Sequence, residues 1–440
     1  MEKMKQSGVQ WIGEIPASWN TKRIKYMATL KGRIGWQGLT SDEYQDEGAF
    51  LITGVDFSDG GIDWENCVHV PMKRWEEAKD IQIQNGDLLI TKDGTIGKVA
   101  IVSDMPGETS LNSGVLRVMS NNGYSNRFLY WVLKSDVFWG WFNYKNAGNS
   151  TIQHLYQGDF AEFLYAFPKI SEQEAIADFL NARCSELDKI ISDLESQIET
   201  LKNYRNSLIT ETIIRGLDDK VELKESGIKW IGKVPVHYQV KKLKYFCAYI
   251  TDGSHFSPET VDYGYPYITA ADVRGVGINY EMAKKISEAD YQLLKKSGCQ
   301  PHKNDVLLVK DGATTGRVGF VTDDTPCVLL SSVAIIRAPQ DMLGKYLMYM
   351  LQSNALQEQI FASMEGSAMP RTILSKIINY YGIVCPLKEQ QNICQYLDDA
   401  CSAIDDTILL KTAQLNDIVN HKSSLIFEYV TGKKRVKEVQ

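Results

Sequence analysis

The chain has 440 residues, 44% of them hydrophobic and 23% charged, which is typical of a globular protein with more than one domain. Its formal net charge of −7 does not mark it as a self-sufficient nucleic-acid binder. The eight cysteines form no CxxC pair and the six histidines show no metal-binding spacing. The composition therefore favours reduced thiols and argues against a zinc site or a disulfide framework.

The sequence gives no sign of secretion or of membrane insertion. The first residues, MEKMKQ, lack the apolar run of a signal peptide. No apolar run elsewhere is long enough to cross a bilayer. We therefore expect a cytoplasmic protein without membrane contact.

The sequence contains an internal repeat. Residues 7–16 (SGVQWIGEIP) return as residues 226–235 (SGIKWIGKVP), and weaker matches follow in the same order through both halves. A colinear series of matches is the sign of repeated structural units. The repeat predicts two similar bodies, each followed by a long helix. Just after this segment, Lys22, Lys25 and Tyr26 recur as Lys241, Lys244 and Tyr245.

Both bodies are predicted to be mixed α/β. In the first, residues 87–91 and 98–102 have the pattern of strands, and the connection 92–97 (KDGTIG) has the glycines of a hairpin loop. The second body repeats this around the loop 310–316 (KDGATTG). Neither loop is a P-loop, because too few residues separate its glycines. The loop is either a plain tight turn or a turn that presents Lys and Thr to a nucleic-acid backbone.

Two further polar loops occupy matching places in the two bodies. Residues 32–38 (GRIGWQG) correspond to 252–257 (DGSHFS), and residues 148–154 (GNSTIQH) correspond to 366–372 (GSAMPRT). Arg can read guanine edges and Gln can read adenine edges in the major groove. Loops that differ strongly between repeated flanks fit two readers of different targets. For each loop the alternative is a solvated connection that binds nothing.

The first long helix is predicted over residues 171–215, a stretch without proline or glycine. Pro168 precedes it, Gly216 follows it, and Ser171 with Glu174 has the spacing of a capping box. At about 1.5 Å per residue the helix would span roughly 67 Å, so it needs a partner helix.

The second long helix, over residues 387–429, is predicted to be that partner. Lys411 stands where the first helix has Leu194, so its seam has one polar interruption. We expect an antiparallel coiled coil with pseudo-twofold symmetry and a body at each end, although any long helical hairpin would show the same periodicity. The predicted seam residues are Leu180, Leu187, Ile191, Leu194, Ile198, Leu201 and Leu208 in the first helix and Leu397, Ile404, Ile408, Leu415, Ile418 and Leu425 in the second.

A search for catalytic motifs finds little. The sequence has no glycine-rich nucleotide fingerprint between a strand and a helix and no Asn/Asp-Pro-Pro-aromatic tetrapeptide of an amino-methyltransferase. Glu222-Leu223-Lys224 matches the ExK pattern of a nuclease, but it lies in a junction where charged residues are expected. The search therefore yields no strong candidate for a catalytic site.

With these features the whole chain resembles the specificity subunit of a type I restriction–modification system. The resemblance is carried by the repeated WIG…P segments, by the Asp-Gly of each hairpin, and by the Pro…Glu-Gln…Ile sequence at each helix start. It implies two target recognition domains, residues 1–168 and 217–386, and two spacer helices, residues 169–216 and 387–440.

In that family each recognition domain binds one half of a split sequence in double-stranded DNA. The helices dock two modification subunits, which hold S-adenosylmethionine and methylate adenine. Restriction subunits add ATP- and Mg-dependent translocation and cleavage. The resemblance thus implies that this chain has no catalysis of its own, which agrees with the motif search, and that it binds no metal or cofactor itself. Its weakly acidic charge is a departure, from which we expect the modification subunits to supply much of the phosphate contact.

The polar loops and the family resemblance predict polar and cationic loop residues as DNA contacts. The sequence of each half-site and the gap between them are not encoded in any pattern that the chain shows. One competing hypothesis is a nuclease or methyltransferase with its own DNA-recognition domain, and another is a purely structural coiled-coil adaptor. For the first half-site we predict contacts from Arg33, Trp36, Gln37, Lys92, Thr95, Lys98, Asn149, Ser150 and Thr151. For the second we predict contacts from His255, Ser257, Lys310, Thr314, Thr315, Arg317, Ser367 and Arg371.

Overall fold

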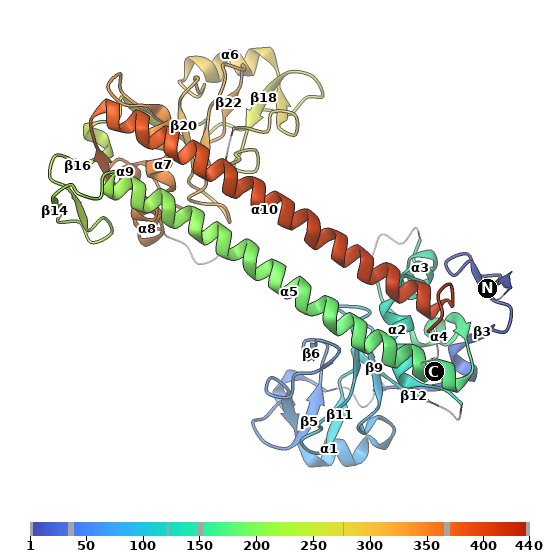
Figure 1. Ribbon diagram of the computed structural model, residues 1–440. Coiled ribbons are helices and arrows are strands. Elements are labelled where there is room, and N and C mark those ends of the chain that lie inside the picture. The colour runs from blue at the N-terminus through green and yellow to red at the C-terminus, as the bar shows by residue number, and fades with distance from the viewer. Residues whose placement is uncertain are drawn as a thin grey trace. The chain divides into compact units, whose positions relative to one another are not determined.

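The computed structural model describes residues 3–33, 39–120, 123–147, 153–275, 277–364 and 370–436. The chain divides into two compact units. The first contains residues 1–194 and 413–440, and the second contains residues 195–412. Each unit therefore includes a segment of both long helices, α5 (Ile170–Arg215) and α10 (Leu387–Val430) (Figure 1).

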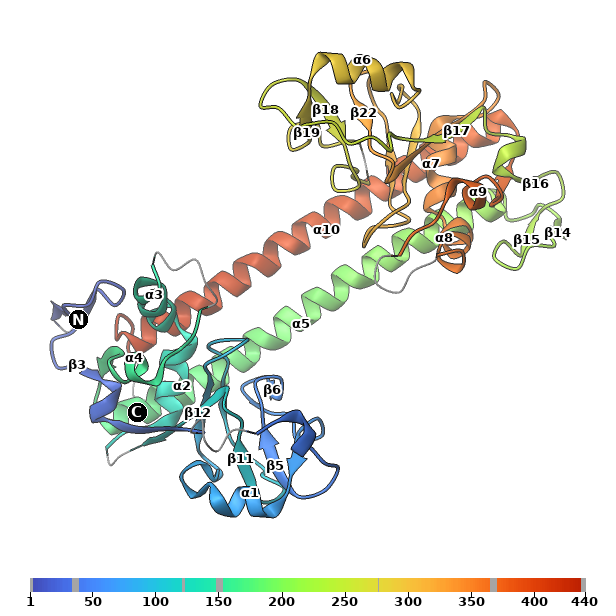
Figure 2. The same cartoon turned by 180° about the vertical axis from the view of Figure 1, so that it is seen from behind.

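The first unit is built on a four-stranded antiparallel sheet with the order β10-β9-β12-β4. A second sheet, β11-β5-β8, pairs β11 and β5 in parallel, and β13 pairs with β3. The elements β5, β11 and α1 gather in one lobe beside β12 (Figure 2). The strands are β1 (Met4–Gln6), β2 (Glu14–Pro16), β3 (Asn20–Arg23), β4 (Ala28–Gly32), β5 (Ala49–Ile52), β6 (Phe57–Ser58), β7 (Gly61–Ile62), β8 (Val68–Val70), β9 (Leu88–Thr91), β10 (Val99–Ile101), β11 (Thr109–Leu111), β12 (Val115–Ser120) and β13 (Leu164–Phe167). The helices are η1 (Ile24–Tyr26), η3 (Ser41–Glu43), α1 (Met72–Glu77), η4 (Lys79–Ile81), α2 (Asn126–Lys134), α3 (Asp136–Lys145) and α4 (Gln157–Ala161).

The second unit repeats this topology. Its four-stranded sheet has the order β21-β20-β23-β17, its second sheet is β19-β18-β22, and β16 pairs with β24. The predicted mixed α/β repeat and both predicted hairpins are thus confirmed. The strands are β14 (Leu223–Glu225), β15 (Lys233–Pro235), β16 (Gln239–Lys242), β17 (Tyr249–Asp252), β18 (Tyr265–Ile268), β19 (Lys284–Ile286), β20 (Val306–Val309), β21 (Val318–Phe320), β22 (Val328–Leu329), β23 (Val333–Arg337) and β24 (Tyr381–Val384). The helices are η5 (Leu243–Tyr245), α6 (Glu288–Lys296), α7 (Gly344–Gln352), α8 (Asn354–Ala362) and α9 (Leu374–Ile377).

The long helices form part of the core in each unit. In the first, Leu180 of α5 and Ile426 of α10 belong to the same buried cluster as Phe128 of α2. In the second, Ile213 of α5 and Leu397 of α10 belong to the cluster of α7. The helix ends are therefore held by apolar burial against the sheets and short helices, and the boundary between the units falls within the two helices.

The two helices run antiparallel in each unit. In the first unit the rings of Phe179 and Tyr429 lie 4.4 Å apart and Lys422 pairs with Asp188, so the residue number falls along α10 as it rises along α5. In the second, Arg205 lies 2.9 Å from Asp405. All thirteen predicted seam residues are buried or half-buried. The polar interruption at Lys411 is accommodated by a hydrogen bond from its Nζ to Gln197 Oε1, at 2.6 Å.

The start of α5 differs in detail from the prediction. The helix begins at Ile170, and the amides of Glu172 and Gln173 donate to the carbonyl of Lys169. Ser171 is therefore inside the first turn, and the predicted capping box with Glu174 is wrong. Short-range spacing cannot distinguish a cap from a first-turn residue when the helix can begin one residue earlier.

Candidate nucleic-acid interface

In the first unit, the sheet register brings two of the polar loops to one edge. Strands β4 and β9 both pair antiparallel with β12, and Gly32 and Ile90 both lie opposite Leu116. The two flanking strands therefore point the same way. Arg33, which follows β4, and the loop 92–98, which follows β9, emerge together.

The second unit has the same arrangement. Strands β17 and β20 flank β23, and Asp252 and Leu308 both lie opposite Ala334. The loop 253–257 and the hairpin 310–317 therefore emerge at the same edge of the sheet. Two loops that are distant in the sequence form one surface because of this strand order.

The third polar segment joins this edge through the hairpin backbone. The amide of Leu155 donates to the carbonyl of Lys92 at 3.0 Å, and the amide of Thr372 donates to the carbonyl of Lys310 at 2.8 Å. The neighbouring side chains also meet, because Asp93 Oδ1 lies 2.7 Å from His154 Nδ1. In each unit the described end of the third polar segment therefore lies at the same sheet edge as the other two loops.

The glycines of the hairpins act as turn residues. Gly97 and Gly316 have φ angles of 81° and 93°, in the region that side chains disfavour. A β-carbon at Gly97 would lie 2.8 Å from the Trp139 ring, and one at Gly316 would lie 2.8 Å from Gln357 Oε1. A turn with close packing thus accounts for these glycines.

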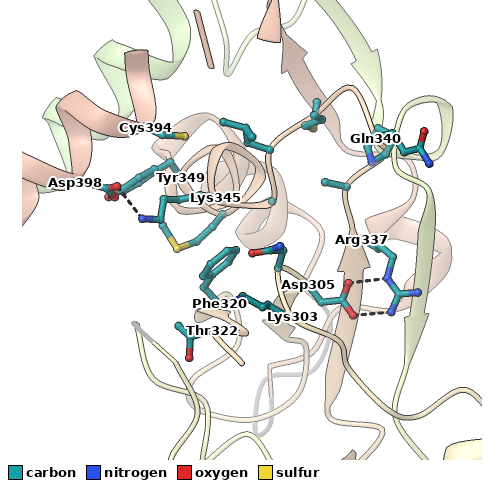
Figure 3. A pocket seen from close by; sticks show the side chains of 17 residues that line it. Lys303, Asp305, Phe320, Thr322, Arg337, Gln340, Lys345, Tyr349, Cys394 and Asp398 are labelled. Carbon is teal, nitrogen blue, oxygen red and sulfur yellow. Dashed lines mark hydrogen bonds and ion pairs between the residues drawn. The ribbon is translucent and has the colours of Figure 1, made fainter. Parts of the chain in front are cut away.

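The sheet of the second unit also borders a cavity of about 810 Å³, at the other end of β20 (Figure 3). Asp305 precedes β20 and accepts two hydrogen bonds of 2.7 Å from Arg337 at the end of β23. On the helical side, Asp398 of α10 accepts hydrogen bonds of 2.8 Å from Lys345 and Tyr349 of α7.

No group of acids, histidines or cysteines in the described parts of the chain could hold a metal ion. None of the helices described is long and apolar enough to cross a membrane.

A family model described as a type I restriction modification DNA specificity domain matches the chain twice, over residues 16–200 and 235–420. The chain belongs to this family. The two matches coincide with the two halves of the internal repeat, and each extends from a body into its following helix. The recognition bodies and the long helices are therefore common to the type I specificity family.

Individual relatives agree over nearly the full length. The chain is 24% identical over 440 residues to a putative type I restriction enzyme MjaX specificity subunit of Methanocaldococcus jannaschii, covering 97% of this chain and 96% of the relative. It is 23% identical over 336 residues to the EcoBI specificity subunit of Escherichia coli, covering 72% and 67%. A chain from a solved structure on complex assembly and conformational transition of the type I R-M system has the same fold, with a TM-score of 0.69, 14% identity and coverage of 96% and 99%.

Within this type I specificity fold, the predicted DNA contacts of the first unit fall into two groups. Thr95 and Lys98 are exposed at the hairpin tip, 3.4 and 3.5 Å from the carbonyl of Gly54, and Lys92 is half-buried beside them. Arg33 is buried and donates to the Leu111 carbonyl at 2.7 Å and to Ser110 Oγ at 3.2 Å. Burial and the nearby Arg74 cation lower the pKa of Arg33. Arg33 could reach a base only by giving up these bonds.

The predicted contacts of the second unit divide in the same way. His255, Ser257 and Arg371 are exposed, whereas Thr314 and Arg317 are half-buried. Lys310 is buried, with its Nζ 3.4 Å from Asp252 and 3.3 Å from Asp311. Thr315 is also buried, and its hydroxyl donates to the carbonyls of Gly312 in the turn and of Pro370.

Sequence reasoning missed the acids of these loops. Asp252 and Asp311 hold Lys310, and Asp93 contacts His154. The repeated Asp-Gly of the hairpins was a signal for two of these acids. The remaining predicted contacts lie outside the described residues: Trp36, Gln37, Asn149, Ser150, Thr151 and Ser367.

Proposed function

We propose that the chain reads a bipartite DNA target, one half-site with each unit, and directs partner subunits to that target. The observation that carries the proposal is the sheet edge of each unit, where three polar segments meet on a scaffold that is repeated in the other unit. The strands and their register are shared, whereas the loop side chains differ. A shared scaffold with different loops can recognise two different short sequences in the same manner.

The helices support a docking role for partners. Besides the buried stripe, α5 and α10 carry large apolar side chains on their outer faces. Leu409 and Leu410 are 69% and 67% exposed and Tyr204 is 56% exposed in the second unit, while Ile190 and Val419 are exposed in the first. Exposed apolar side chains on a helix that already has its partner indicate a further protein contact. We infer that each unit docks one modification subunit here, so that one chain takes two.

The chemistry is assigned to those partners. S-adenosylmethionine would be held by the modification subunits, and ATP and Mg by restriction subunits, so the chain itself would be non-catalytic. The described residues offer no metal cluster, and the sequence has no nucleotide or methyltransferase motif. The expected location of such an assembly is the cytoplasm, where the DNA is.

Methylation mapping tests the function directly. A host that carries this chain with its modification partner should show methylated adenines in one split sequence. Exchanging the first body for that of another specificity chain should change one half-site and leave the other unchanged. Unchanged methylation targets after this exchange would favour a structural adaptor, and methylation or cleavage by the purified chain alone would favour an enzyme with its own reader.

A further inference from the structure

Both units carry the same basic and aromatic motif, residues 22–26 (KRIKY) and 241–245 (KKLKY). The central aliphatic residue is fully buried in each, and the tyrosine that ends the motif is 65% and 69% exposed. In each motif a lysine Nζ lies 5.2 Å from the centre of that tyrosine ring. The two units therefore present basic side chains and an exposed tyrosine ring at matching positions.

Folding accounts for only part of this motif. The buried Ile24 and Leu243 fill the core, and their amides donate to the carbonyls of Phe163 and Tyr380. Exposed lysines and tyrosines contribute little to stability, so packing does not require them to match. Because the loops at the sheet edge differ between the units while these exposed residues agree, both motifs should face the same kind of partner.

The motif lies at the other end of the sheet from the polar loops. In the first unit the motif precedes β4 and the loop residue Arg33 follows β4. The strand between them is about 17 Å long at ~3.3 Å per residue. In the second unit η5 precedes β17, and the loop 253–257 follows it. A DNA duplex bound by the loops would therefore contact the end of each sheet that is remote from the motif.

In the second unit the motif borders a hollow surface. Lys241 and Tyr245 line a cavity of about 490 Å³, whose apolar lining includes Phe246 and Met342. Met342 and Pro339 also line the larger cavity of Figure 3, so the two hollows share a wall. The hollow is lined by polar side chains such as Lys241 as well as by apolar ones, and a concave surface of this mixed kind can receive a side chain of a partner protein.

The charge of this surface indicates the chemistry of the partner. Among the described residues, no carboxylate pairs with Lys241 or Lys244. Lys303, on the rim of the larger cavity, is exposed and also pairs with no carboxylate of the described chain. The acids of the larger cavity, Asp305 and Asp398, are paired with Arg337 and Lys345. Asp341 lines the smaller hollow and offsets one of the three lysines. The net charge of the groups without an ion pair on this surface is therefore positive.

We propose that the two motifs, with the hollow beside the second, dock an acidic segment of the modification subunit, one copy in each unit. The inference rests on the proposed function and names a second contact besides the helices. The units should differ in strength. Glu162 pairs with Arg23 and Lys25 in the first unit, whereas Asn379 takes its place before the matching carbonyl of Tyr380. The second unit should therefore bind its partner more tightly.

Charge reversal tests the proposal. K241E/K244E should weaken binding of the modification subunit to the second unit at least tenfold, and Y245A should weaken it by a smaller factor. K22E/K25E should have the smaller effect of the two charge reversals. The matched control is K295E/K296E, the same charge change on the exposed side of α6. Affinity and stoichiometry of the full chain with purified modification subunit would be measured by calorimetry and native mass spectrometry at two salt concentrations, with melting temperature to confirm folding.

The outcomes separate the possible ligands. Loss of partner affinity in K241E/K244E but not in the control, with unchanged DNA affinity once the complex is saturated, would support the proposal. Unchanged partner affinity with weaker DNA binding and a smaller salt dependence would overturn it and assign the motif to DNA phosphates. If the wild-type chain bound no modification subunit at all, the proposed function itself would fail.

Discussion

Gln173 near the start of α5 offers a sharp test of how the body is joined to its helix. Its side chain is fully buried, its Oε1 accepts from the amide of Ser125 at 2.9 Å, and its Nε2 donates to the carbonyl of Pro168 at 2.9 Å. Gln390 makes the same pair of bonds in the second unit, to Leu343 and Cys385. Each glutamine thus satisfies two backbone groups, at the start of a short helix and at the end of a strand.

The substitutions Q173A and Q390A should each destabilise their own unit by about 2–6 kcal/mol. A buried backbone group left without a partner costs about 1–3 kcal/mol, and each substitution leaves two. Water that entered the space left by the side chain would bring the value toward the lower end of this range. Q173L and Q390L fill more of that space but exclude water, so they should cost at least as much as the alanine variants.

The assay is denaturant unfolding of the full chain, followed by hydrogen exchange at the amides of Ser125 and Leu343. Q173A should reduce protection at Ser125 and leave Leu343 unchanged, and Q390A should do the reverse. The controls are Q414A and Q391A, exposed glutamines on α10 in the first and second units, which should change stability by less than about 0.5 kcal/mol. An effect of Q173A as small as that of Q414A would refute the reasoning.

Three further predictions concern the reading edge and the helices. K98A should weaken DNA binding by the assembled complex for all sequences alike and reduce the slope of log affinity against log salt by about 1, as for a phosphate contact; an altered half-site would instead indicate base reading. K310M should destabilise the second unit by about 3 kcal/mol in denaturant titrations, because it leaves Asp252 and Asp311 without their buried cation, and a neutral result would contradict this. Insertion of one heptad after Leu194 and another after Gln414 keeps the two helices in register. Because seven residues add about 10.5 Å, the gap between the two half-sites should lengthen by at most about three base pairs. Changed half-sites would rule out the helices as spacers.

The large-scale organisation could be predicted from the sequence because it rests on signals that span many residues. The repeat located both bodies, and the apolar stripe located both helices to within one residue of their ends. The Glu-Gln pairs at 172–173 and 389–390 marked the helix starts. Their role in joining body to helix depends on backbone groups far away in the sequence, such as Ser125 and Leu343, and could not be predicted.

The candidate site was predictable as loops but less so as single side chains. The loops follow strands, and the strand order brings them together. Whether a lysine or arginine in a loop is exposed depends on neighbours from other segments. Arg33 turns inward to the carbonyl of Leu111, and Lys310 turns inward to Asp252, whereas Lys98 remains outside. Local composition has no information on these contacts.

The internal repeat allows a comparison that a single domain would not. Buried positions agree in the two units because both must pack the same core, so their agreement says nothing about partners. Exposed positions are free to drift, and here they behave differently at the two ends of the sheet: the loops after β4 and β17 differ, and the motif before them agrees. A partner that differs between the units, such as a DNA half-site, fits the first end, and a partner that is the same in both, such as a second copy of one subunit, fits the other. In each unit, recognition of the DNA sequence and recruitment of the subunit that modifies it would thus lie at opposite ends of one strand, β4 or β17.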